Sequence, residues 1–507
     1  MTMVANASPK AGARLNRQQR RQAARLAKGG RRGNVAAAPT DAALQEAVKL
    51  HKAGHPHEAL HAYRRILATR PNHADALNFA GVAAVQTGAL DEAIKLLRAA
   101  VTAVPDYAEA HMNLGNVLQA SDQVTEAAIA YRRAIKIEPD NARAHYNLGV
   151  LLQASGDPEK AIAAYRTAVE IRPDYGEAHL NLGAVLRKFG DPQKAVATCR
   201  RAIELKPDDP SAYNNLGIAL RVCGEREEAA QALNRAIEIA PNYGKAHYNL
   251  AQLVYHETDL APAASALATA LRVEPGLAPA RFFLGVICDQ QGDDAAASDH
   301  FAQLAQSPED FTHMVDSWSY AKSMRGPATR FHADTFETLK FGLNQATVDG
   351  LVLEFGVRFG NSINFIAKNV DRDVHGFDSF QGLPEAWAGH ETGVYTTDGM
   401  LPQVALNVRL HVGLFDETLP GFVAEHSGPI RFMNVDCDLY NSTKTIFEFL
   451  GDRIVSGTII VFDEYLMNST WRQDEYKAFQ EAVEENSWKY EYLAFNLFSR
   501  QAAVKIL

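Results

Sequence analysis

The sequence is poor in cysteine and contains no long apolar run. Its 507 residues include four cysteines, whose spacing is neither that of a metal site nor that of a disulfide scaffold (Cys199, Cys223, Cys288 and Cys437). Free thiols persist in a reducing compartment, so we expect a cytoplasmic protein. No stretch reaches the roughly 18–20 consecutive apolar residues that a membrane-spanning helix needs. The N-terminus also lacks the apolar segment of a secretory signal, so a transmembrane protein is not expected.

Basic charge is concentrated at the N-terminus and is in deficit elsewhere. Residues 1–40 carry nine basic side chains and no acidic one, whereas the remaining 467 residues carry 42 basic and 60 acidic side chains. Such an acidic body argues against a nucleic-acid partner, because phosphate contacts need clustered Lys and Arg. We expect residues 1–39 to form a disordered, solvated basic arm, and contact of this arm with acidic lipid or RNA is the alternative.

Proline recurs every 34 residues in the first part of the chain, at positions 71, 105, 139, 173, 207, 241 and 275. Ten residues after each proline stands a small residue (Gly81, Gly115, Gly149, Gly183, Gly217, Ala251 and Gly285). A proline ends a helix because it lacks an N–H and clashes with the preceding turn, and a small residue lets two helices approach closely. A fixed period of this length therefore indicates a repeat architecture.

These features, with the strings HMNLG, HYNLG, HLNLG, YNNLG and HYNLA, resemble the tetratricopeptide repeat, a 34-residue pair of antiparallel helices. The resemblance implies about eight repeats over residues 40–311, an all-α superhelix whose concave groove binds a protein or peptide partner. Five asparagines recur at the same period on the first helix of their repeats (Asn113, Asn147, Asn181, Asn215 and Asn249). This ladder resembles that of the O-linked N-acetylglucosamine transferase, whose amides hold an extended peptide. The alternative is that each asparagine bonds its own backbone.

Beyond residue 311 the period ends, and short apolar runs alternate with helical stretches. The candidate strands are Leu351–Phe355, Val374–Phe377, Arg409–Val412, Ile430–Val435, Thr458–Phe462, Tyr490–Phe495 and Ala502–Ile506. Strands interleaved with helices predict a mostly parallel α/β sheet over residues 346–507, with its ligands beyond the carboxyl ends of the strands. Residues 312–345 are interpreted as a helical connector or cap over the site, with a simple spacer as the alternative.

The residues after the first two of these strands predict a nucleoside-containing cofactor. The first strand runs into a loop with two glycines, Gly356 and Gly360, that lets the backbone approach a ligand before a helix begins. Asp378 ends the second strand, 24 residues after Glu354, where a carboxylate can accept hydrogen bonds from a ribose diol. Because the loop has neither the full dinucleotide glycine pattern nor a lysine, S-adenosylmethionine fits better than NAD or ATP.

Four carboxylates follow two later strands. Asp436 and Asp438 come after the fourth strand, and Asp463 and Glu464 after the fifth. Clustered acids repel one another unless a cation or protons neutralise them. Oxygen-only ligands with no His or Cys nearby favour Mg²⁺ over Zn²⁺. The alternative, that some of these acids merely cap the helices that follow, applies best to Asp438 or Glu464.

Several strings of residues 325–507 resemble the macrocin O-methyltransferase family in family order: LEFGVRFGNS, GFDSFQGLPEAW, GMLP, VGLFDETLP, VDCDLYNST and IVFDEY. The resemblance implies a Rossmann-like class I methyltransferase domain that uses S-adenosylmethionine to methylate sugar hydroxyls. It assigns the metal to Asp436, Asp463 and Glu464, although Asp-Asp is more frequent in the family than Asp-Glu. It assigns cofactor contacts to Glu354, Gly356, Gly360, Ser362, Asp378 and Ser379, with Gly413 and Phe415 near the adenine.

The sequence thus predicts a multidomain enzyme with repeats that bind a partner or carrier. A general base must remove the proton of a sugar hydroxyl whose pKa Mg²⁺ lowers. We expect Asp436, or Asp438 as second choice, to fill this role, whereas His375 and His411 are expected to pack or face solvent. Trp387 and Tyr395 are interpreted as an aromatic lid or as loop anchors. The alternatives are a methyltransferase of a protein acceptor held in the groove and a non-enzymatic scaffold.

Overall fold

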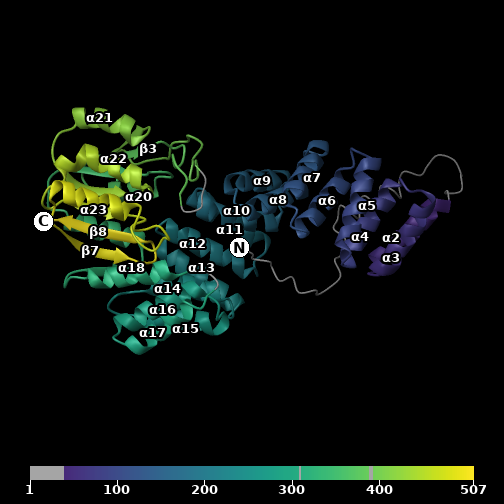
Figure 1. The fold of residues 1–507 in the computed structure, drawn as a ribbon, viewed down its shortest axis with the longest axis horizontal. Helices are drawn as coiled ribbons and strands as arrows, with labels where there is room; N and C mark the ends of the chain where they lie inside the picture. Colours follow the sequence, from purple (N-terminus) through teal and green to yellow (C-terminus); the bar gives the residue numbers. More distant parts are fainter. Residues whose placement is uncertain (1–38, 308–309, 388–391) are drawn as a thin grey trace. The chain divides into compact units, whose positions relative to one another are not determined.

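The computed structural model describes residues 39–307, 310–387 and 392–507 (Figure 1). The predicted basic arm therefore lies almost entirely outside the described residues. The chain divides into two compact units, residues 1–178 and 179–507. The division falls inside a helix of the fifth repeat, so the later repeats belong to the same unit as the sheet.

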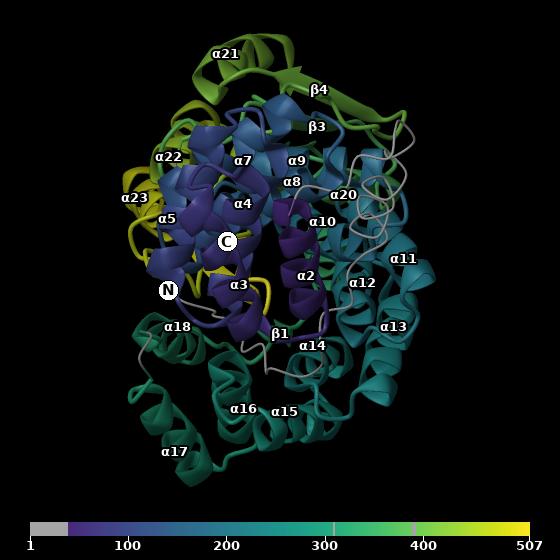
Figure 2. The same cartoon turned by 90° about the vertical axis from the view of Figure 1, so that its right-hand side faces the viewer.

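Sixteen helices form eight consecutive hairpins in the described part of residues 39–304, as the repeat predicts. They are α2 Pro39–Lys52, α3 Pro56–Thr69, α4 Ala74–Gln86, α5 Leu90–Ala103, α6 Ala108–Ala120, α7 Val124–Ile137, α8 Ala142–Ala154, α9 Pro158–Ile171, α10 Gly176–Phe189, α11 Pro192–Leu205, α12 Pro210–Val222, α13 Arg226–Ile239, α14 Gly244–Val254, α15 Ala261–Val273, α16 Ala278–Gln290 and α17 Asp294–Leu304. The second helix of each of the first seven hairpins ends two residues before a periodic proline. In Figure 2 the helices α11 to α17 follow one another along an arc.

The periodic glycines allow close approach of the two helices in a hairpin. A Cβ atom at Gly115 would lie 2.6 Å from the ring of Tyr131, and one at Gly149 would lie 2.7 Å from the ring of Tyr165. Real Cβ atoms do not come this close to a neighbour, so any larger residue would push the hairpin apart. The predicted reason for the small residues is confirmed.

An α/β sheet with flanking helices follows the repeats (Figure 1). Its elements are α18 Thr312–Ser323, β1 Arg330–His332, α19 Thr335–Gln345, β2 Leu351–Phe355, α20 Asn361–Lys368, β3 Val374–Asp378, β4 Val408–Val412, α21 Phe415–Glu425, β5 Ile430–Val435, α22 Tyr440–Leu450, β6 Ile459–Phe462, α23 Glu475–Asn486, β7 Tyr490–Asn496 and β8 Gln501–Ile506. All seven candidate strands are present within one residue of the predicted bounds. The segment expected as a helical connector or cap, residues 312–345, contains α18, α19 and, between them, the additional strand β1.

The eight strands form one sheet in the order β1-β7-β8-β6-β5-β2-β3-β4. Every pair is parallel except those of β8 with β6 and with β7. The mostly parallel Rossmann-like sheet is therefore confirmed. Because β2 stands between β3 and β5, the chain reverses its direction of winding there, and the loops after β2, β3 and β5 open at the same edge.

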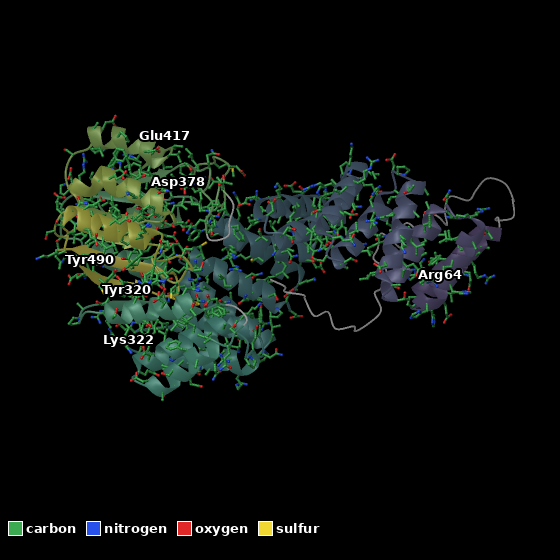
Figure 3. The ribbon with its side chains drawn as sticks, viewed as in Figure 1. Arg64, Tyr320, Lys322, Asp378, Glu417 and Tyr490 are labelled. Atoms are coloured by element: carbon green, nitrogen blue, oxygen red, sulfur yellow. The ribbon has the colours of Figure 1, made fainter. Side chains whose placement is uncertain are left out.

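Both faces of the sheet are covered, and the last repeats help to cover one of them. Helices α19 and α20 pack on one face, and α21, α22 and α23 pack on the other, in a core that also includes residues of α14, α15, α16 and α18. The rings of Phe283 on α16 and Phe498, between β7 and β8, stack with centroids 3.8 Å apart. The hydroxyls of Tyr320 on α18 and Tyr492 on β7 lie 2.7 Å apart, and Figure 3 labels Tyr320 where α18 meets the sheet.

Candidate functional site

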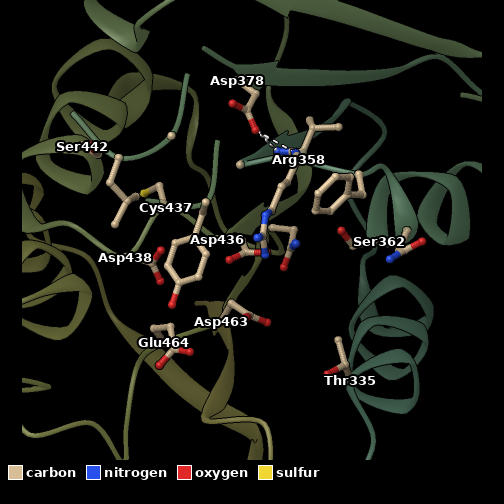
Figure 4. A pocket seen from close by; sticks show the side chains of 18 of the residues that line it. Thr335, Arg358, Ser362, Asp378, Asp436, Cys437, Asp438, Ser442, Asp463 and Glu464 are labelled. Carbon is tan, nitrogen blue, oxygen red and sulfur yellow. Dashed lines mark hydrogen bonds between the residues drawn. The ribbon is translucent and has the colours of Figure 1, made fainter. Parts of the chain in front are cut away.

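A cavity of about 760 Å³ opens at the carboxyl ends of β2, β3, β5 and β6. Ten of the twelve catalytic, cofactor and metal residues predicted for the second half line it: Gly356, Ser362, Asp378, Ser379, Gly413, Phe415, Asp436, Asp438, Asp463 and Glu464. Glu354 and Gly360 do not line it. Figure 4 shows Asp378 and Glu464 on opposite sides of this cavity, with Asp436 and Asp463 between them.

Asp378 ties the ends of β2 and β3 together. Its Oδ2 accepts hydrogen bonds from the backbone N–H groups of Val357 (2.8 Å) and Arg358 (2.7 Å), and its Oδ1 accepts one from that of Phe380 (2.6 Å) (Figure 4). A carboxylate has about four lone-pair directions. The cavity-lining carboxylate of Asp378 is therefore rigidly held and retains one direction for a ligand hydroxyl.

Glu354 and Asn434 form a buried polar pair beneath the cavity. Glu354 is fully buried on β2, and its Oε1 accepts a hydrogen bond from Asn434 Nδ2 (2.9 Å) on β5. Burial raises the pKa of Glu354 to about 8. Glu354 Oε2 and Asn434 Oδ1 have no hydrogen-bond partner among the described residues. Asn434 lines the cavity, so this pair can receive a donor from a ligand, a role that the sequence analysis assigned to Glu354 alone.

Gly356 is required by the backbone of the site itself. Its φ is +90°, and a Cβ there would lie 1.7 Å from the carbonyl oxygen of Asp436. No side chain fits at this distance, so the loop after β2 can cross the end of β5 only with glycine here. Gly360 immediately precedes the first turn of α20. Its φ of +80° lies in the left-handed region that favours glycine, so this glycine also shapes the backbone of the loop.

The four predicted carboxylates of Asp436, Asp438, Asp463 and Glu464 come together on one side of the cavity (Figure 4). Burial raises the pKa of Asp436 well above its usual range, and repulsion from Asp463 and Asp438 adds to the effect. Burial likewise raises the pKa of Asp438, followed by repulsion from Glu464 and Asp463. The cluster therefore favours a bound cation or protons.

The turn between β7 and β8 supplies partners for the acidic pair. Arg500 Nη1 donates to Glu464 Oε2 (2.8 Å), and Gln501 Nε2 donates to Asp463 Oδ1 (2.7 Å). Within the described ranges, no group of three or more His, Cys, Asp or Glu side chains is arranged to hold a metal ion. Arg500 was not predicted as a site residue, because it lies in no motif and comes to the site only at the start of the antiparallel strand β8.

The fifth and sixth repeats form another wall of the cavity. Arg187, Lys188, Gly190 and Pro192 line it around the α10–α11 connection, as do Ile218, Arg221 and Val222 on α12. Arg358 Nη2 donates to the carbonyl of Phe189 (2.5 Å), and the Arg358 guanidinium lies 4.7 Å from the ring centroid of Tyr395. The rings of Phe189 and Tyr395 also stack, with centroids 6.4 Å apart. The repeats thus line the cavity together with Asp334, Thr335 and Phe336 of the segment expected as a connector or cap, a contribution of the repeats that the sequence did not indicate.

Two histidines and two aromatic residues were given no firm role in the site from the sequence. His375 Nδ1 and His411 Nε2 lie 3.1 Å apart on β3 and β4 and do not line the cavity. Trp387 Nε1 donates to Asp474 Oδ2 (3.2 Å), so Trp387 anchors its loop. Tyr395 lines the cavity, and burial raises its pKa to about 12.

Members of the asparagine ladder form side-chain hydrogen bonds within each unit. In residues 1–178, Asn113 Nδ2 donates to Asn78 Oδ1 (2.9 Å) and Asn147 Nδ2 donates to Asn116 Oδ1 (2.7 Å). In residues 179–507, Asn249 Nδ2 donates to Asn214 Oδ1 (2.7 Å), while Asn215 is half-buried on α12. These donors link the first helices of adjacent repeats, so part of the ladder stabilises the stack.

Comparison with known proteins identifies both parts of the chain. A profile of the tetratricopeptide repeat matches residues 44–108, 93–142, 108–176, 146–210, 180–244 and 248–311, which together exceed half of the chain. A profile described as a methyltransferase domain matches residues 353–465. The sequence resemblance to repeats followed by a methyltransferase domain is therefore confirmed.

A curated relative is the 8-demethyl-8-(2,3-dimethoxy-alpha-L-rhamnosyl)-tetracenomycin-C 4'-O-methyltransferase of Streptomyces olivaceus. It is 28% identical over 161 residues, which are 26% of this chain and 60% of that protein. The chain therefore spans about three-fifths of the length of this relative.

Solved structures similar to this chain include the repeat proteins YrrB, MamA and a tetratricopeptide repeat protein from Parabacteroides merdae. YrrB, described as having an unusual peptide-binding site, is 23% identical, with a TM-score of 0.34 over 36% of this chain and 95% of its own. MamA is 28% identical, with a TM-score of 0.31 over 34% and 93%. The Parabacteroides merdae protein is 20% identical, with a TM-score of 0.40 over 47% and 94%.

No helix in the described ranges is both long enough and apolar enough to cross a membrane.

Proposed function

Since the chain belongs to the tetratricopeptide repeat family and carries a methyltransferase domain, we propose that it is an S-adenosylmethionine-dependent, Mg²⁺-assisted O-methyltransferase of sugar hydroxyls. The observation that carries this proposal is the composition of one cavity. The loop after β2 and Asp378 lie on one side of it, and four carboxylates lie on the other. A nucleoside cofactor and a hydroxyl-bearing acceptor can therefore bind next to each other.

The residues of the cofactor side fit S-adenosylmethionine, which supplies an activated methyl group on a sulfonium. The unpartnered oxygens of Asn434 and Glu354 can accept hydrogen bonds from an ammonium group. The remaining lone pair of Asp378 can accept one from a ribose hydroxyl. Gly413 and Phe415, after β4, line the same half of the cavity and are the proposed contacts of the adenine.

The acidic side offers the chemistry that Mg²⁺ prefers, although its carboxylates in the described ranges are not arranged around an ion, so they would have to converge on it. When bound, Mg²⁺ would lower the pKa of a sugar hydroxyl and hold its oxygen in place. Asp436, Asp463 and Glu464 offer only oxygen donors, the chemistry that Mg²⁺ prefers. Their mutual repulsion in a half-buried cluster is the physical reason to expect a cation there. Arg500 already neutralises part of this charge through Glu464, so its side chain would have to share Glu464 with the ion.

Asp436, the first choice from the sequence, and Asp438, the second, are the two candidate bases. Asp438 has φ 62° and lies in the half-buried cluster, where burial raises its pKa and the nearby charges of Arg358 and Arg500 oppose that rise. A carboxylate that binds a cation is a weaker proton acceptor. If Asp436 binds the ion, Asp438 is the better group to receive the proton of the acceptor hydroxyl. Tyr395, held by Arg358 and Phe189, covers the same region and helps to exclude water.

The relative from Streptomyces olivaceus, named as a methyltransferase of a rhamnosyl-bearing tetracenomycin, supports a sugar hydroxyl as the acceptor. The repeats support a protein or peptide partner or carrier, which we propose to bind along the ladder of Asn113, Asn147, Asn181, Asn215 and Asn249.

The test is transfer of labelled methyl from S-adenosylmethionine into an extract of a strain that lacks this protein, with Mg²⁺ or with chelator. Chelator-sensitive label in a saccharide fraction is expected, and label in protein instead would identify a protein acceptor. Asp436→Asn should reduce transfer about 100-fold or more while leaving S-adenosylhomocysteine binding within about threefold. Asp371→Asn, an exposed acid of the same domain, is the matched control. Unchanged transfer by Asp436→Asn would refute the proposed chemistry.

A further inference from the structure

The repeat wall of the cavity is cationic and faces the acidic cluster. Arg187 and Lys188 at the end of α10 and Arg221 at the end of α12 line the cavity. Arg187 and Arg221 are half-buried, and neither forms an ion pair with a carboxylate of the described chain. Arg187 Nε is buried and has no hydrogen-bond partner there. Removing a guanidinium group from water without a counter-ion costs free energy. A bound anion would offset this cost, so we expect the wall to bind one.

The charges around these cations support the same conclusion. Burial lowers the pKa of Arg187, and the nearby Arg221 lowers it further. Burial also lowers the pKa of Lys188, followed by repulsion from Arg187 and Arg500. Burial lowers the pKa of Arg221, and the carboxylate whose charge most opposes this effect is that of Asp334. Its Oδ1 accepts hydrogen bonds from the backbone N–H groups of Phe336 (2.9 Å) and Glu337 (3.1 Å). Positive charge therefore exceeds negative charge on this wall.

The cationic wall belongs to the acceptor half of the cavity. Lys188 lies close enough to Arg500 for the two to repel, and Arg500 pairs with Glu464 of the acidic cluster. Arg500 follows β7, and the sheet order places β8 and β6 on the opposite side of β5 and β2 from β3 and β4. Asp378, by contrast, ends β3 on the cofactor side. A volume of about 760 Å³ is in the upper part of the roughly 300–1,000 Å³ of small-molecule sites, which leaves room for two ligands.

We infer that the acceptor carries a phosphate or diphosphate ester, bound by Arg187 and Arg221 with Lys188, beside the sugar whose hydroxyl faces the carboxylates. This inference rests on the proposed function, because it names the acceptor class of that reaction. Two guanidinium groups match phosphate oxygens by paired hydrogen bonds. Three cations also exceed the charge of one carboxylate, which favours a diphosphate over a sugar acid. The repeats then act as part of the acceptor site.

Calorimetric titration of the full chain with inorganic pyrophosphate and with uridine diphosphate glucose tests the inference, with S-adenosylhomocysteine titrated in parallel. Arg187→Gln/Arg221→Gln should weaken binding of both phosphate probes about 30- to 100-fold and leave S-adenosylhomocysteine binding unchanged. Arg201→Gln/Arg235→Gln removes the same charge from exposed positions of α11 and α13 and should bind like the unmodified chain.

A short prenyl diphosphate separates the two sources of such an ester. Tighter binding of uridine diphosphate glucose indicates a sugar nucleotide, and tighter binding of the prenyl diphosphate indicates a lipid-linked sugar. If the double variant does not fold, the unmodified chain decides, because phosphate binding at this wall must weaken with added salt.

Four results would overturn the inference. The first is that the unmodified chain binds S-adenosylhomocysteine but neither phosphate probe, and the second is that it binds the probes without any dependence on salt. The third is that the double variant binds the probes as tightly as the exposed-position control does. The fourth is that the double variant loses S-adenosylhomocysteine as strongly as the probes, which would assign the cations to the cofactor. Failure of the unmodified chain to bind S-adenosylhomocysteine would instead count against the proposed function, while pyrophosphate binding still reports on the arginine pair.

Discussion

Phe283 of α16 is the residue through which a repeat is expected to stabilise the sheet. Its side chain is 4% exposed, its ring stacks on that of Phe498 at 3.8 Å with an angle of 11° between the planes, and it packs edge-on against Phe282 at 5.0 Å. Phe→Ala in a core costs about 3–5 kcal/mol from lost burial and the cavity left behind. Phe283→Ala should therefore destabilise the sheet as well as its own repeat.

Tryptophan fluorescence during urea unfolding measures this effect selectively. All four tryptophans of the chain lie between residues 318 and 488, in α18 or in the sheet domain (Trp318, Trp387, Trp471 and Trp488). With a urea dependence of about 3 kcal/mol per molar, the expected loss lowers the fluorescence midpoint by about 1–1.7 M.

Leu97→Ala on α5 is the matched control, because Leu97 is fully buried in a repeat of residues 1–178. In repeat arrays each unit contacts only its neighbours, so this change should alter the helical circular dichroism transition and leave the tryptophan midpoint nearly unchanged. A tryptophan midpoint that Phe283→Ala shifts no more than Leu97→Ala does would refute the shared core.

Three further outcomes follow from individual contacts. Gly115→Ala should lower stability by about 1–3 kcal/mol, measured by circular dichroism, because its Cβ would meet the ring of Tyr131 at 2.6 Å; an unchanged melting curve would contradict the close helix approach. Asn113→Ala should cost about 1–3 kcal/mol, because it leaves the buried Oδ1 of Asn78 unpaired; a neutral result would leave the ladder to partner binding alone. Burial lowers the pKa of His375 to about 4 from 6.5. The unfolded chain therefore takes up a proton first, and stability should fall as the pH drops from 6.5 toward 4, by at most about 1.4 kcal/mol per pH unit. His375→Gln should flatten this part of the melting temperature against pH, and an equally steep curve would contradict the assignment.

The repeats and most of the sheet could be predicted because their signals are local. The periodic prolines and the glycines exemplified by Gly115 each act on the helix that contains them or on the next one. The strands after residue 346 are short apolar runs with polar residues at their ends, which is enough to place them within one residue. Strand β1 was missed because three residues with one large apolar side chain, Phe331, give no periodic signal.

The site residues that belong to strand-end motifs were predicted from the sequence, whereas the residues that contact them from other elements were not. Asp378 and Asp436 were found because they end strands, where the topology of a parallel sheet gathers polar side chains. The partnership of Glu354 with Asn434 was missed because it joins neighbouring strands that are 80 residues apart in the chain. Arg500 was missed for the same reason, since only the antiparallel return of β8 beside β6 brings it to Glu464.

The repeat architecture, the sheet and the classes of residue at its carboxyl edge follow from the order of the amino acids alone, because period and strand-end position are properties of neighbouring residues. Which elements close the cavity depends instead on how the chain packs in three dimensions. Helices α10 and α12 bring Arg187 and Arg221 to a site whose motifs begin more than a hundred residues later. A wall of this kind depends on packing between distant segments, and no local pattern of side chains encodes it.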